Sequence, residues 1–167
     1  GNETFNDLSA PSLTDIGGQL NINYHFNLAN IDLAALTNVG ANCTIQNNYG
    51  LESITLTALE DIDGSFEFNN GNEINSLDLP ALTDVGGSIT INNNDRLESF
   101  SAPLLESLGP TLTIRDNPDL TDVDLSSLTC VSDFTIEGND LTEDAHYDLL
   151  VALTCSSDDS LIVFRDT

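Results

Sequence analysis

Acidic side chains recur at fixed intervals along the chain, and they are the first candidates for chemistry. One column, with steps of 23 residues, contains Asp15, Asn38, Asp61, Asp84 and Ser107, and a second contains Asp32, Thr55, Asp78, Ser101 and Asp124. Carboxylates stacked one repeat apart repel by ~0.9 kcal/mol in water, and calcium, which prefers several oxygen ligands, could relieve that repulsion. The candidate calcium ligands are Asp61, Asp63 and Asp84, or Asp116 with Asp119. The alternative is a solvated acidic surface, since the chain has no EF-hand or calcium-binding nonapeptide.

Uncharged polar side chains form the second candidate, at positions that would face outward from a strand. They make two columns: Asn21, Thr44, Glu67, Thr90, Thr113 and Thr135, and Asn23, Gln46, Asn69, Asn92, Arg115 and Glu137. All of these except Glu67 and Glu137 constitute the predicted ligand-binding face. Short amides and hydroxyls suit recognition of carbohydrate or of protein backbone. Two alternatives stay open: an ice-binding threonine ladder, which the charged residues would interrupt, and a solvated face of β-favouring residues.

Catalysis finds no support in the residue pattern. His25 and His146 are far apart in a solenoid, and neither has a serine or cysteine placed as a nucleophile. The search finds no catalytic triad, HExxH motif or phosphate-binding loop. We therefore expect a protein that is not an enzyme and that uses no cofactor, apart from the possible calcium.

A repeat of constant length must position these columns. An apolar residue opens each repeat, at Ala10, Leu33, Leu56, Leu79, Ala102 and Leu125, and every step is 23 residues. Such a period is typical of a solenoid, in which neighbouring repeats share one core. We predict one domain over 1–167, with a polar lead-in at 1–9, repeats at 10–140 and a C-terminal cap at 141–167.

Within each repeat, alternating apolar residues predict two short strands. The first are Leu20–Ile22, Cys43–Ile45, Phe66–Phe68, Ile89–Ile91, Leu112–Ile114 and Phe134–Ile136, and the second are Ile31–Leu33, Ile54–Leu56, Leu77–Leu79, Phe100–Ala102 and Val123–Leu125. Stacked repeats would align them in two parallel sheets with strands ~4.8 Å apart. Glycines at the corners, such as Gly40, Gly64 and Gly86, would permit a positive φ.

A column of asparagines follows the first strand of the repeats. It contains Asn48, Asn94, Asn117 and Asn139, with His25 and Gly71 at the two remaining positions. Asparagine side chains bond readily to backbone groups in turns. We therefore predict a structural asparagine ladder that pairs turn amides from one repeat to the next.

The motif of Leu79–Leu82, Val85-Gly86-Gly87, Ile89–Ile91, Asn94 and Leu97 resembles that of the receptor L-domain family of leucine-rich-repeat proteins, over roughly residues 8–140. That family includes ligand-binding lobes of hormone and growth-factor receptors, fungal cell-wall proteins and microbial surface proteins. The resemblance implies a mainly β fold: a right-handed parallel β-helix of about six repeats. It also implies a role in recognition or adhesion at the cell surface.

The C-terminal segment breaks the period. Thr142 is a suitable N-cap for a capping helix from Glu143, and Leu161–Phe164 is a candidate final strand. Cys130 and Cys155 bracket this segment, and we predict that they form a disulfide, which would stabilise the fold by roughly 3.5 kcal/mol. Two unrelated thiols are the alternative. Cys43 occupies an inward strand position, where we expect a buried free thiol.

The charge balance limits the possible partners. The chain has three arginines, no lysine and 28 acidic residues, for a net charge of −25. Nucleic acid and anionic membranes are therefore excluded as expected partners, and no run is long enough to span a bilayer. Screening of such a charge favours a saline setting.

The predicted disulfide indicates an extracellular or cell-surface protein, with possible glycan acceptors at Asn2 and Asn42. We expect a non-catalytic recognition, adhesion or surface-structural module that binds protein or carbohydrate. The alternative is a self-assembling structural subunit, in which the partner is another copy of the chain.

Overall fold

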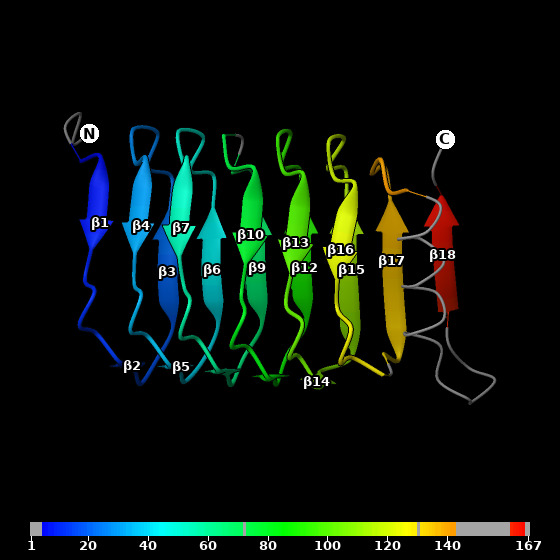
Figure 1. Ribbon diagram of the computed structural model, residues 1–167, viewed down its shortest axis with the longest axis horizontal. Coiled ribbons are helices and arrows are strands. Elements are labelled where there is room, and N and C mark those ends of the chain that lie inside the picture. The colour runs from blue at the N-terminus through cyan, green and yellow to red at the C-terminus, as the bar shows by residue number, and fades with distance from the viewer. Residues whose placement is uncertain (1–4, 72, 130, 143–160, 166–167) are drawn as a thin grey trace.

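The computed structural model is a parallel β-solenoid of about six turns at 23-residue spacing, and it describes residues 5–71, 73–129, 131–142 and the backbone of 161–165. One side is a seven-stranded parallel sheet, the main sheet. Its strands run side by side along the long axis of the molecule (Figure 1). In chain order they are β3 (Leu20–Asn23), β6 (Cys43–Gln46), β9 (Phe66–Asn69), β12 (Ile89–Asn92), β15 (Thr111–Arg115), β17 (Asp133–Glu137) and β18 (Leu161–Arg165).

The opposite side carries the second set of predicted strands. They form two separate three-stranded sheets: β1 (Asp7–Ser9), β4 (Asn30–Asp32) and β7 (Ser53–Thr55), and then β10 (Ser76–Asp78), β13 (Ser99–Ser101) and β16 (Asp122–Asp124). These strands begin one residue earlier than predicted, although the same side chains face the core. The predicted lead-in is also partly wrong, because Leu8 lies in β1 and pairs with Ile31 of β4.

A third ladder corrects the prediction of only two sheets. Strands of two residues pair side by side along one edge: β2 (Asp15–Ile16), β5 (Asn38–Val39), β8 (Asp61–Ile62), β11 (Asp84–Val85) and β14 (Ser107–Leu108). Each precedes a corner at which the chain turns into the main sheet. Two residues are too few to show the alternation that identifies a strand in the sequence, so the ladder was assigned to the corners.

One continuous apolar core fills the solenoid between these walls. The seven apolar residues of the fourth repeat are all 0% exposed: Leu79, Leu82, Val85, Ile89, Ile91, Leu97 and Phe100. Their equivalents in other repeats stack on them, because successive strands pair without any shift in register. Each repeat therefore buries its apolar side chains against the next one, which a single repeat could not do alone.

The predicted asparagine ladder is confirmed, and its bonds have one direction. Nδ2 of Asn94 donates to the carbonyl of Phe68 at 3.1 Å, while Oδ1 of Asn94 accepts the N–H of Gly71 at 2.8 Å. Asn48, Asn117 and Asn139 hold their preceding repeats in the same way. Each asparagine is thus a clamp that satisfies two backbone groups of the turn in the preceding repeat, where burial would otherwise leave them unpaired.

The positive φ angles lie at another place than the predicted corners. In the described residues they occur directly after the main strands, at Tyr24, Asn47, Asn70, Asn93, Asp116 and Gly138. The corner glycines serve close packing instead. A Cβ on Gly40 would lie 3.0 Å from the carbonyl oxygen of Gly17, and one on Gly86 would lie 2.5 Å from that of Asp63.

The third repeat departs from the clamp pattern at Gly71. A Cβ on Gly71 would lie 2.8 Å from the ring of Phe68, which is the only aromatic residue at a strand position where the other repeats have isoleucine. The larger side chain thus occupies the space of the missing asparagine, and the turn after β6 lacks its clamp. Close to this point the opposite side is interrupted, since β7 and β10 belong to different sheets and are more widely separated in Figure 1.

Replacing both residues by those of the other repeats tests this compensation. Gly71→Asn alone should destabilise the fold by about 1–3 kcal/mol, because the new side chain collides with Phe68. Phe68→Ile alone should leave a cavity. The double variant should recover part of both losses, with a favourable coupling of about 0.5–3 kcal/mol in chemical denaturation. Gly71→Asn with Phe66→Ile is the control, and equal coupling in both cycles would contradict the compensation.

The predictions for the C-terminal segment have different outcomes. The final strand is confirmed, since β18 pairs with β17 in parallel. The predicted capping helix and the disulfide between Cys130 and Cys155 lie outside the described residues. Cys43 is free and 0% exposed, as predicted, and burial raises the pKa of its thiol to about 12.

Thiol counting tests the state of all three cysteines. At pH 8 the folded chain should not react with a thiol reagent at Cys43, because this thiol is both buried and protonated. After unfolding without a reductant we expect one reactive thiol per chain, from Cys43. Three reactive thiols would contradict the disulfide, and rapid reaction of the folded Cys43→Ala variant would show that the other cysteines are accessible thiols.

Candidate functional site

The predicted face is a continuous surface of the main sheet. Register places Asn21, Thr44, Glu67, Thr90, Thr113 and Thr135 in one line across six strands, and Asn23, Gln46, Asn69, Asn92, Arg115 and Glu137 in a parallel line. Asn21 and Arg115 are exposed, and the other members are half-buried between their neighbours. The structure therefore brings all the predicted face residues together on one side of the solenoid.

Part of the second line serves the fold rather than a ligand. Oδ1 of Asn69 accepts the backbone N–H of Asn92 at 3.0 Å. Arg115 forms an ion pair with Glu137 on the next strand. These side chains have partners within the sheet, so only a fraction of their hydrogen-bonding capacity faces solvent.

The first line differs in this respect. The hydroxyls of Thr44, Thr90 and Thr113 make no hydrogen bond to other described residues, whereas the hydroxyl of Thr83, on another side of the repeat, donates to the carbonyl of Glu60 at 3.0 Å. A hydroxyl can both donate and accept. The threonine line therefore presents a row of unoccupied donors and acceptors at the ~4.8 Å spacing of the strands.

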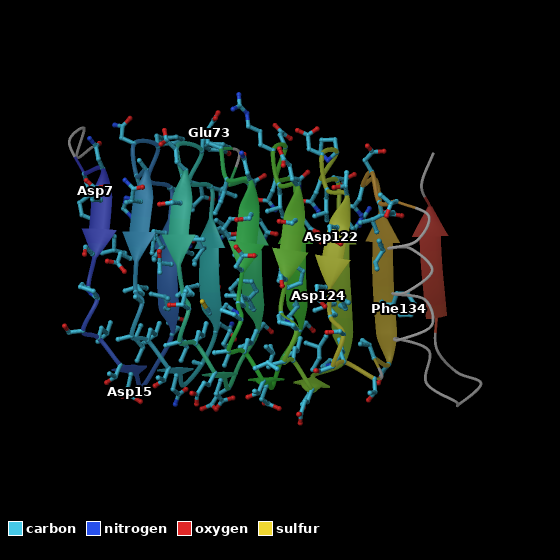
Figure 2. The ribbon with its side chains drawn as sticks, in the orientation of Figure 1. Asp7, Asp15, Glu73, Asp122, Asp124 and Phe134 are labelled. Atoms are coloured by element: carbon cyan, nitrogen blue, oxygen red, sulfur yellow. The ribbon has the colours of Figure 1, made fainter. Side chains whose placement is uncertain are left out.

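The acidic columns lie on the narrow ladder and on the opposite side from the main sheet. Asp61 and Asp84 are register partners on β8 and β11. Figure 2 shows Asp15 at the edge of the narrow ladder, and Asp122 and Asp124 on β16. Within the described part of the chain, no group of three or more His, Cys, Asp or Glu side chains is arranged to hold a metal ion, and this includes the calcium candidates Asp63, Asp116 and Asp119.

Crowding of carboxylates has its clearest effect at Asp61. Desolvation raises the pKa of this carboxyl, and the charges of Asp63 and Asp84 raise it further, against a lowering by the backbone hydrogen bond from Ile62. Its pKa is thus higher in the folded chain than in the unfolded chain. The free energy of unfolding therefore falls as the pH rises above 3.8, the usual carboxyl value, and the destabilisation is complete at neutral pH.

Asp61→Asn should consequently raise stability at pH 7. The gain should be below about 1 kcal/mol, because exposed charges are screened by solvent, and it should shrink in high salt and disappear below the usual carboxyl pKa. Thermal unfolding as a function of pH and salt measures it. Asp15→Asn is the matched control, since the register partner of Asp15 is the neutral Asn38. An equal gain from both variants would contradict the local explanation.

The sequence analysis missed a group of exposed aromatic side chains. Tyr24 and Phe26 lie in the turn after β3, and Tyr49 lies in the turn after β6. They are 64%, 63% and 40% exposed. Phe26 and Tyr49 are one repeat apart, and this spacing was a signal in the sequence, but exposure cannot be read from a turn whose residues do not alternate.

Comparison of the chain with protein-family models, with curated proteins and with solved structures gives no match. In the described residues, no helix is long and apolar enough to cross a membrane.

Proposed function

We propose that this protein is an extracellular, non-catalytic recognition or adhesion module, and that its solenoid is a right-handed β-helix of the receptor L-domain type. It binds its partner through the outward face of the main sheet. The observation that carries the proposal is the threonine line, whose hydroxyls at Thr44, Thr90 and Thr113 have no partner in the fold. Exposed sheets of solenoids are extended surfaces on which ligands bind.

The chemistry of this face limits the partner. Hydroxyls and amides in rows at strand spacing match the donors and acceptors of a polysaccharide or an extended polypeptide. The face contains few charges, although the whole chain has a net charge of −25. A polyanion such as nucleic acid would be repelled. Protein or carbohydrate at a cell surface is therefore the partner class that the side chains fit.

Removing the free hydroxyls tests the proposal without altering the shape of the sheet. Thr90→Val and Thr113→Val keep a β-branched side chain and should leave stability nearly unchanged. Each lost hydrogen bond of about 0.5–1.5 kcal/mol should weaken binding roughly 2- to 10-fold. Binding is measured on arrays of glycans and of displayed peptides, followed by titration of the ligand found.

The matched control is Thr83→Val, whose hydroxyl bonds to the backbone of the preceding repeat. It should lower stability slightly and leave binding unchanged. Unchanged affinity in Thr90→Val, Thr113→Val and their double variant would show that the threonine line is a solvated surface without a role in recognition.

A further inference from the structure

The three exposed aromatic residues form one patch in the first two repeats. We call Tyr24, Phe26 and Tyr49 the aromatic patch. The rings of Phe26 and Tyr49 stack with centroids 5.6 Å apart and planes inclined by 9°. The fourth and fifth repeats have Asp95 and Pro118 at the equivalent position, so the stacked pair is particular to this end of the solenoid.

Folding does not account for these side chains. None of the three belongs to the apolar core or packs against it. Tyr24 has a φ of 61°, at the position where the other five repeats have asparagine, aspartate or glycine. Those residues adopt left-handed backbone readily, whereas tyrosine does so at a cost of about 1–2 kcal/mol. An exposed, strained residue of this type is a reason to consider function.

The surroundings of the patch contain no charge. Residues 16–31 and 33–51 contain no Asp, Glu, Lys or Arg, and the first arginine of the chain is Arg96. This is the longest uncharged region in a chain whose net charge is −25. An anionic ligand would find no counter-charge here, and a cationic ligand would find no carboxylate within these two segments. The patch therefore suits a neutral ligand.

Amide groups lie beside the rings. Oδ1 of Asn47 accepts hydrogen bonds from Oη of Tyr49 at 3.3 Å and from Nδ2 of Asn70 at 3.0 Å. With its oxygen occupied twice, Asn47 keeps Nδ2 as a donor that has no other described partner. Thr44 and Gln46 precede Asn47 on β6 and face outward from the sheet. Apolar rings with a few fixed polar groups beside them are the usual composition of a small-ligand site.

We propose that the aromatic patch binds a neutral carbohydrate. The C–H face of a sugar would lie against the exposed rings, and its hydroxyls would bond to Asn47 and to the outward side chains of β6. This inference rests on the proposed recognition function, and it assigns the ligand to the first two repeats rather than to the whole sheet. A neutral sugar combines the apolar face, the hydroxyls and the absence of charge that this region requires.

The test uses the full chain and an array of neutral, sulfated and uronic-acid glycans, followed by calorimetry with the soluble oligosaccharide found. Phe26→Ala and Tyr49→Ala should each weaken binding roughly tenfold. Tyr24→Asn is the most informative variant. It restores the residue that the other turns use, so it should raise thermal stability while weakening binding, and unfolding cannot explain that combination. Leu104→Ala, at an exposed leucine elsewhere, should change neither.

Three results would overturn this inference. The first is an array on which the protein binds no neutral glycan. The second is wild-type affinity in Phe26→Ala and Tyr49→Ala. The third is a dimer of the wild-type chain in light scattering that these variants abolish, because the patch would then be an interface between copies.

The same array separates the two proposals. Binding that is lost in Thr90→Val and Thr113→Val but retained in the patch variants overturns the patch and supports the sheet. Binding that is lost only in the patch variants supports the patch and overturns the role of the threonine line.

Discussion

Pairing of the backbone at the turns after the main sheet is the constraint on which the solenoid depends. Each of these turns passes from one sheet to the other across the core, where unpaired amides are costly. The asparagine of the next repeat satisfies two of its groups, and Asn94 and Asn117 are 0% exposed while doing so. Because every clamp reaches into the preceding repeat, it also fixes the spacing and register between repeats. A side chain therefore determines an arrangement that hydrogen bonds between strands alone would leave open to slippage.

The exception at Gly71 marks a change in the chemistry of the solenoid. On one side of it, the first two repeats are uncharged along the turns and the main sheet, and they carry the exposed aromatic rings. On the other side, the turns carry charges that pair between repeats, as Glu73 and Arg96 do at 3.0 Å. The main sheet continues across this point without interruption. The fold is thus uniform, while the properties of its surface differ between its two parts.

The sequence was sufficient for features that repeat with clear alternation. Strands, register and the asparagine ladder were predicted because inward residues such as Ile89 and Ile91 recur every 23 residues with a polar residue between them. The narrow ladder was missed because two-residue strands show no alternation. The role of the corner glycines was misassigned because glycine serves both positive φ and close packing, and only the distance to the preceding repeat, as at Gly86, separates these uses.

Recognition is harder to predict than fold in such a chain, because most turn positions accept many residues. Phe26 and Tyr49 occupy positions of this kind, so their presence alone says little about selection. Tyr24 is different, because it occupies a position that the backbone restricts in every other repeat. A residue that opposes a local requirement of folding must be retained for another reason, or it would be replaced by one that the turn accommodates better. The strongest indication of a binding site in this solenoid is therefore a departure from its repeat pattern rather than the pattern itself.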